Sequence, residues 1–131
     1  MKRARIDAFL TIAGEELAAA IQLETILPRQ SAYFLSQAVE KLLRALVEAE
    51  DRVAGTTHNL GFLAGLLDNG HPLLNDFLAL EHLTSASTST RYPSSTGRLY
   101  DIDARRLSDD LNSVKSLIGQ TTAYLATSKK A

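Results

Sequence analysis

Apolar side chains recur at steps of three and four residues along most of this 131-residue chain. An α-helix has about 3.6 residues per turn, so this spacing gathers apolar side chains on one face of a helix. Three long stretches carry the pattern: Ile6, Phe9, Leu10, Ala13, Leu17, Ala20 and Ile21; Phe34, Leu35, Ala38, Leu42, Ala45, Leu46 and Ala49; and Ala104, Leu107, Leu111, Val114, Ile118 and Leu125. No stretch alternates apolar and polar residues as a half-buried strand does. The sequence therefore predicts an all-α fold.

Capping and breaking residues predict where the first helices begin and end. The first helix is expected over residues 4–27, because Pro28 lacks the N–H that would continue it. The second is expected over 32–51, with Ser31 as its N-cap. Opposite charges four residues apart predict two ion pairs on the second helix, Glu40 with Arg44 and Glu48 with Arg52.

The later helices are expected to be shorter until the last one. A third helix is predicted from Leu60 to Leu67, and a fourth begins at Pro72. Residues 84–96 contain nine Ser or Thr, so they either extend the fourth helix to about residue 90 or form a loop. Asp101 or Asp103 caps a last helix that reaches about residue 126, and residues 127–131 are a frayed tail. Short connections favour an up-and-down bundle of about five helices, in a single domain over 1–131.

Composition excludes several function classes. The chain has 14 Lys and Arg against 15 Asp and Glu, a net charge of −1, so bulk positive charge does not drive nucleic-acid binding. Cysteine is absent, which excludes disulfides, thiolate metal sites and thiol nucleophiles. The basic start is interrupted by acidic residues before any long apolar run, so we expect a cytoplasmic protein without a signal peptide or membrane span.

The usual catalytic and cofactor patterns are missing. No two histidines share a helix face at a spacing of three or four, so no metal site is expected; the three are His58, His71 and His82. No glycine-rich phosphate loop is present, and no cofactor is expected. Asp109 and Asp110 are adjacent and are expected to be a solvated acidic surface.

Two short motifs remain as candidates for chemistry. Thr57-His58-Asn59-Leu60 opens the predicted third helix, where the His is either functional or a structural residue of the helix terminus. In Arg91-Tyr92-Pro93, an Arg suited to phosphate stands beside a Tyr that can stack on a base. The alternative is a structural Arg–Tyr pair at a proline bend.

At this point the chain resembles the HEPN domain family. Residues 32–46, Ala-Tyr-Phe-Leu-Ser-Gln-Ala-Val-Glu-Lys-Leu-Leu-Arg-Ala-Leu, are similar to the second-helix signature of that family. The His58 motif is similar to its His-x-Leu turn, and Arg91-Tyr92-Pro93 is similar to its Arg-Tyr-Pro element. The three matches occur in family order and cover nearly the whole chain, so a HEPN-like bundle is expected.

The resemblance implies several functions. HEPN domains are commonly dimeric, and many pair with minimal nucleotidyltransferases in toxin–antitoxin modules. Our first hypothesis is a nucleotide- or RNA-binding accessory domain, with a homodimer and a small nucleotidyltransferase as expected partners. The alternatives are a metal-independent endoribonuclease toxin and a structural partner-binding bundle without a ligand. Apolar residues on more than one face of the fourth helix also favour a homodimer; they are Leu73, Leu74, Phe77 and Leu83.

The resemblance also assigns site residues. Six side chains are expected to converge on one ligand-binding groove: Glu40, Lys41, Arg44, His58, Arg91 and Tyr92. The ribonuclease branch of the family carries an Arg, a gap of four to six residues, and then a His. Arg52 and His58 fit that gap, with five residues between them. Arg52 is followed by an apolar residue and lies earlier than the family's motif, so the sequence favours binding over catalysis and predicts no appreciable ribonuclease activity for the protein alone.

Overall fold

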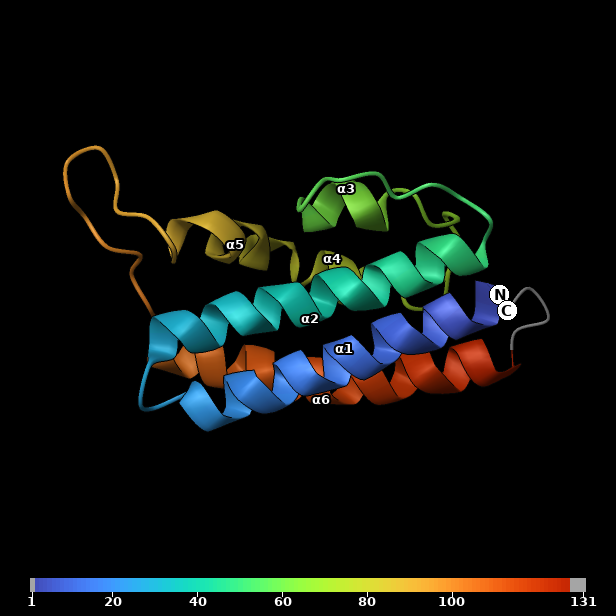
Figure 1. Ribbon diagram of the computed structural model, residues 1–131, viewed down its shortest axis with the longest axis horizontal. Coiled ribbons are helices and arrows are strands. Elements are labelled where there is room, and N and C mark those ends of the chain that lie inside the picture. Colours follow the sequence, from blue (N-terminus) through green and yellow to red (C-terminus); the bar gives the residue numbers. More distant parts are fainter. Residues whose placement is uncertain (1, 128–131) are drawn as a thin grey trace.

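The computed structural model describes residues 2–127 and shows an all-α bundle built around one central helix. Its helices are α1 (Lys2–Leu23), α2 (Pro28–Ala49), α3 (Leu60–Ala64), α4 (Leu74–Leu78), the 3-10 helix η1 (Glu81–Ser85), α5 (Ala86–Ser89) and α6 (Ala104–Thr127). The three long helices α1, α2 and α6 run side by side (Figure 1). α2 also packs against α3, η1 and α5, so it is covered on several sides. The predicted fold class is confirmed.

The junction between the first two helices differs from the prediction. α1 ends at Leu23, and Pro28 is the first residue of α2 rather than a break before it. Proline suits this position because the first N–H groups of a helix have no internal partner. Ser31 is therefore inside the helix and is fully buried, and its hydroxyl donates to the Ala20 carbonyl at 2.6 Å. This residue fastens α2 to α1 and does not cap the helix.

The segment between residues 60 and 90 contains only short helical turns. The predicted third helix stops at Ala64, and the fourth becomes α4, η1 and α5. Residues 84–90 of the Ser/Thr-rich stretch are mostly helical, and an irregular segment then leads to α6. Asp103 accepts a hydrogen bond from the Arg106 backbone N–H at 3.1 Å, which confirms it as the cap of α6. Of the predicted frayed tail, Thr127 is the last residue of α6, and 128–131 lie outside the described residues.

The apolar residues of the segment between residues 60 and 90 contribute to the core. Leu73, Phe77 and Leu83 are buried within the chain, so they are not surplus apolar surface, and our argument for a dimer through the fourth helix is wrong. α3, η1 and α5 pack against α2, α4 packs against α3, and these side chains belong to one core. Ile12 and Ile21 of α1 are about two-fifths exposed, at 39% and 42%. Among the described helices, none is long and apolar enough to cross a membrane.

Candidate functional site

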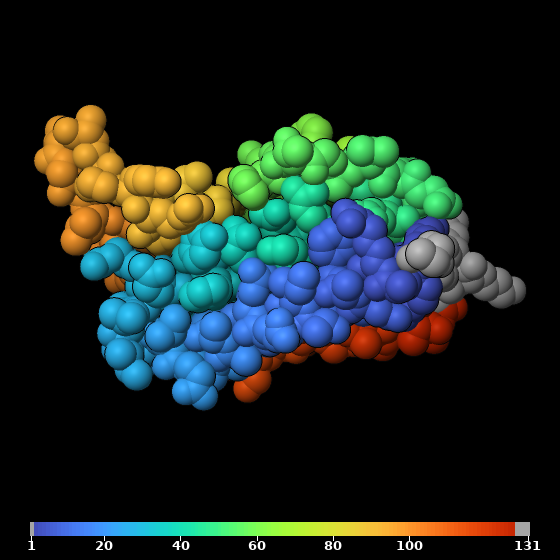
Figure 2. All heavy atoms as spheres, in the orientation of Figure 1, coloured from blue at the N-terminus to red at the C-terminus, as the bar shows by residue number. Residues whose placement is uncertain are grey.

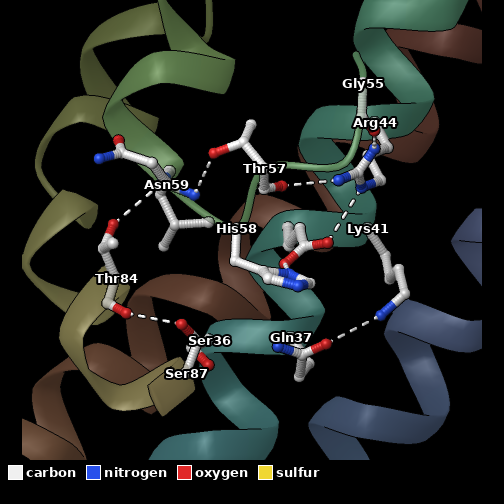
Figure 3. A network of polar contacts seen from close by, with 12 residues as sticks. Ser36, Gln37, Lys41, Arg44, Gly55, Thr57, His58, Asn59, Thr84 and Ser87 are labelled. Carbon is white, nitrogen blue, oxygen red and sulfur yellow. Dashed lines mark hydrogen bonds and ion pairs between the residues drawn. The ribbon is translucent and has the colours of Figure 1, made fainter. Parts of the chain in front are cut away.

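One face of α2 carries a row of polar and aromatic residues. Tyr33, Gln37, Glu40 and Arg44 follow one another at steps of four, three and four, so they lie on the same side of the helix. Their interactions beyond α2 reach the turn before α3 and the end of α5. Figure 3 shows part of this row, with His58 directed back toward α2.

Glu40 is the centre of the row. Its side chain is 5% exposed, and its two oxygens hold different partners. Oε2 accepts from Nε of Arg44 at 3.0 Å, and Oε1 lies 2.8 Å from Nδ1 of His58. The Glu40–Arg44 pair predicted from the sequence is thus confirmed. A buried carboxylate needs such partners, because burying an unpaired charge is costly.

Arg44 holds the chain segment that carries His58. Its guanidinium donates to the carbonyls of Gly55 and Thr57, both at 2.7 Å (Figure 3). Gly55 has a φ of 74°, a conformation that side chains other than glycine rarely adopt. The side chain of Asn59 then caps α3 by accepting from the Phe62 N–H at 2.8 Å. The loop before α3 is therefore fixed at both ends.

This arrangement prepares His58 for hydrogen bonding or proton transfer. Its side chain is 60% exposed, while its carboxylate partner Glu40 is buried. With Nδ1 occupied by Glu40, Nε2 is the nitrogen left for a ligand. A carboxylate on one ring nitrogen orients an imidazole and fixes its tautomer. The structure thus shows His58 as a residue of the helix terminus whose Nε2 has no hydrogen-bond partner among the described residues.

Lys41 is engaged on the neighbouring side of α2. Its ammonium group lies 3.3 Å from both carboxylate oxygens of Glu16 and 3.3 Å from Oε1 of Gln37. Burial raises the pKa of the Glu16 carboxyl, and the charge of Lys41 works against that increase. Lys41 therefore serves as an internal partner between α1 and α2.

Arg91, which follows α5, is the basic side chain of the predicted groove that has no ion pair among the described residues. Its guanidinium lies 5.5 Å from the ring centroid of Tyr33 and 5.7 Å from that of Tyr92, so it is flanked by two aromatic faces. Among residues 2–127, no carboxylate lies within 4.0 Å of it. Arg91 and Tyr92 are both exposed. The structural Arg–Tyr pair is present, and it leaves the guanidinium free to meet an anion.

A surface pocket lies next to this stack. Its volume is about 460 Å³, and it is lined by Thr88, Ser89, Tyr92, Pro93, Ser94, Arg98, Leu99 and Tyr100. Tyr92 and Leu99 are 65% and 62% exposed. In Figure 2 the segment around residues 91–100 projects from one end of the molecule. The pocket thus combines two aromatic rings, several hydroxyls and Arg98.

The six residues of the predicted groove form two groups along α2, one around Glu40 and one around Tyr33. Glu40, Arg44 and His58 form one network, with Lys41 beside it, and Arg91 with Tyr92 forms the other. No direct contact joins the two groups among the described residues. Tyr33, beneath Arg91, precedes Glu40 by seven residues, which is about 10 Å along a helix. Gln37 lies between them on the same face.

Among the described residues, Arg52 and His58 share no hydrogen bond and no interaction partner. α2 ends at Ala49, so the helical spacing that would pair Arg52 with Glu48 is lost. Arg52 instead binds Asp68 at 2.7 Å and donates to the Leu66 carbonyl, while Glu48 pairs with Arg5 at 2.7 Å. The predicted Glu48–Arg52 pair is wrong, because the turn after α2 redirects Arg52 to the loop after α3.

Two residues with interactions at candidate sites were not predicted from the sequence. Tyr33 supports Arg91 from α2, and its place within the family-like helix signature gave no sign of that contact. Asp110 was expected on a solvated surface, but it is 8% exposed and lies 2.8 Å from Nε2 of His82. Its helical spacing was the available signal: Asp110 follows Leu107 by three residues and precedes Val114 by four, which places it on the apolar face of the helix.

A comparison with protein families supports the resemblance to HEPN domains. The model of the HEPN domain family matches residues 6–121. A search of curated proteins and a search of solved structures each gave no match. The match spans most of the chain and includes the α2 signature, the His58 turn and the Arg91 motif. The chain therefore belongs to the HEPN domain family.

Proposed function

We propose that this HEPN domain binds a nucleotide unit, a phosphate joined to an accessible base, either in single-stranded RNA or as a free nucleotide. The observation that carries the proposal is the exposed Arg91 guanidinium, flanked by two tyrosines and without a carboxylate partner among the described residues. Arg binds phosphate through charge-assisted hydrogen bonds, and an exposed Tyr offers a stacking surface for a base. The adjacent pocket of about 460 Å³ supplies hydroxyls and Arg98.

The two basic residues of the predicted groove that lie on α2 already have partners, which supports the choice of Arg91 as the binding residue. Arg44 is 12% exposed and already binds Glu40 and two carbonyls, and Lys41 is 19% exposed and binds Glu16. These groups stabilise the bundle and hold His58 in place. In this proposal Arg91 and Tyr92 are the primary contacts, and His58 is a secondary hydrogen-bond donor or acceptor through Nε2. Glu40 and Arg44 act as positioning residues.

The test is fluorescence anisotropy with a labelled single-stranded RNA, with ATP and duplex RNA as competitors. Replacing Arg91 or Tyr92 with Ala should weaken binding at least about tenfold, since stacking and charged hydrogen bonds each contribute about 1–3 kcal/mol. Lys115→Ala is the matched control, because Lys115 is an exposed cation in α6 without an ion pair among the described residues. Equal loss in the control would show nonspecific charge attraction and contradict the site.

A second candidate function is the metal-independent endoribonuclease, and the Glu40–His58 pair favours it. In that reaction a ribose 2′-hydroxyl attacks the adjacent phosphorus, a base takes its proton, and the 5′-oxygen leaves after gaining a proton. Nε2 of His58 suits the role of base because Glu40 fixes Nδ1. Arg52 is bound to Asp68 and is not the partner cation within one chain, so a second subunit would have to supply it.

Incubation of purified protein with single-stranded RNA and transfer RNA in chelator separates the two functions. The binding hypothesis predicts no cleavage. Cleavage that disappears in both His58→Ala and Glu40→Gln, with RNA binding retained, would replace it with the ribonuclease hypothesis.

We also propose a protein partner of the nucleotidyltransferase class, the type associated with many HEPN domains. Support comes from the family membership of the chain. Co-purification of the domain with a small nucleotidyltransferase encoded beside it is the direct test. If co-expressed proteins elute separately in gel filtration, this pairing is wrong.

A further inference from the structure

A second pocket, of about 250 Å³, lies between η1 and the beginning of α6. It shares only Tyr100 with the pocket beside Arg91, so the two sites are distinct. Pockets that hold drug-sized ligands are about 300–1,000 Å³. The space therefore suits a smaller molecule than a nucleotide.

The wall of this pocket contains the His82–Asp110 pair. Nε2 of His82 lies 2.8 Å from Oδ2 of Asp110, and their side chains are 29% and 12% exposed. Nδ1 of His82 has no hydrogen-bond partner among the described residues. A carboxylate on one nitrogen orients the ring and leaves the other for a ligand. Beside the pair, the Ser85 and Tyr100 hydroxyls are 3.4 Å apart and also line the pocket.

Asp110 pairs with His82 and not with Arg106. Arg106 precedes Asp110 by four residues in α6, a spacing that brings opposite charges together on a helix. His82 takes the Asp110 carboxylate instead, and no carboxylate within residues 2–127 lies within 4.0 Å of the Arg106 guanidinium. Arg106 is exposed and lines the pocket. It is therefore a cation available to a carboxylate ligand.

An acidic group and an apolar surface complete the lining. Asp101 is exposed, and its carboxylate has no hydrogen bond or ion pair with another described residue. The other two acidic residues of the lining have partners: Asp103 accepts a hydrogen bond from the Arg106 backbone N–H, and Asp110 pairs with His82. Leu83 and Leu107 are buried residues that also line the space. Among the described residues, the pocket thus offers one cation and one carboxylate without a partner, together with two hydroxyls, an oriented imidazole and an apolar wall.

We infer that this pocket binds a small zwitterion of the α-amino acid class. Arg106 receives the ligand's carboxylate, and Asp101 receives its ammonium group. Leu83 and Leu107 pack against its apolar side chain. Nδ1 of His82 and the Tyr100 hydroxyl supply further hydrogen bonds. This ligand uses the two charged side chains of the lining that have no hydrogen bond or ion pair among the described residues, whereas a simple anion would face Asp101 and a simple amine would face Arg106.

Isothermal titration calorimetry with each proteinogenic amino acid tests the proposal on the intact purified chain. At least one apolar amino acid should bind at millimolar or lower concentration. Its analogues without the amino group or without the carboxylate should bind at least about tenfold more weakly, because each loses a charge-assisted hydrogen bond. For L-leucine these analogues are 4-methylpentanoate and 3-methylbutylamine.

Two variants locate the binding. Arg106→Ala and Asp101→Asn should each weaken binding at least about tenfold. Arg105→Ala is the matched control, because Arg105 is the exposed neighbour of Arg106 and does not line the pocket. The proposal fails if no amino acid binds, if either analogue binds as tightly as the parent, or if Arg106→Ala binds as the control does. None of these outcomes affects the RNA-binding test, since Arg91 and Tyr92 do not line this pocket.

Discussion

Removing the Glu40 carboxylate tests whether it organises the candidate site. Glu40 is buried and joins Arg44 at 3.0 Å and His58 at 2.8 Å. Glu40→Ala deletes both interactions and leaves the Arg44 guanidinium, 12% exposed, with only its two carbonyl partners. His58 is 60% exposed and exchanges its carboxylate for water. The stability loss therefore comes mainly from Arg44.

The expected loss in the free energy of unfolding depends on how exposed each side chain is. Breaking a buried ion pair by removing one partner costs about 3–5 kcal/mol, and the carbonyls that Arg44 retains put this case near the lower end, at about 3 kcal/mol. Glu40→Gln preserves the shape and one acceptor oxygen, so it should cost about 1–2 kcal/mol. His58→Ala should cost less than about 1 kcal/mol, because the His58 side chain is itself 60% exposed.

Urea denaturation measures these differences in the free energy of unfolding. With the slope m unchanged, Glu40→Ala should lower the midpoint by about 1–2 M. Glu15→Ala is the matched control, since Glu15 is an exposed carboxylate in α1 without an ion pair among the described residues, and it should change stability by less than about 0.5 kcal/mol. In a double-mutant cycle, Glu40→Ala and Arg44→Ala should be less than additive by at least about 1 kcal/mol. A Glu40→Ala loss no larger than that of the control, or full additivity, would refute the reasoning.

Three further predictions concern stability and assembly. Burial lowers the pKa of His71 below 6.5, so folding favours its neutral form. The stability present above about pH 6.5 therefore falls as the pH drops from there toward the lower pKa of the folded protein. His71→Gln should reduce the pH dependence of urea unfolding in that window, and an unchanged dependence would contradict this prediction. Ser31→Ala removes the buried hydrogen bond to the Ala20 carbonyl and should lower stability by about 1 kcal/mol, whereas Ser31→Ala unfolding at the wild-type urea midpoint would show that the bond contributes nothing. Light scattering at micromolar concentration should give the mass of a homodimer, with the exposed apolar residues of α1 as its contact face, and a monomer mass would end that proposal.

The sequence alone determined the features that depend on neighbours along one helix. Three long amphipathic stretches predicted α1, α2 and α6, because the apolar spacing of a long helix is set by its own period. The Glu40–Arg44 pair followed for the same reason, since residues four apart on a helix are neighbours whatever surrounds them. The family signature was also readable, because its three motifs lie in order along the chain.

The tertiary structure decided the features whose partners are distant in sequence. Ser31 has the residue type of an N-cap, but Pro28 began the helix earlier and brought the hydroxyl against α1. The helices predicted from Leu60 to Leu67 and from Pro72 onward are shorter or divided in the structure, because short helices receive their stability from tertiary packing rather than from local propensity. Asp110 meets His82 across 28 residues of sequence.

The same distinction applies to the candidate site. The sequence identified Arg91, Tyr92 and His58 as candidate residues. Their partners Tyr33 and Glu40 lie in α2, which is far from the Arg91 motif in sequence. Spacing rules apply within one element, whereas the packing of α5 and the His58 loop on α2 determines which groups meet. For that reason the sequence identified the residues of the site, and only the fold showed that Arg44 and Lys41 are engaged while Arg91 is available.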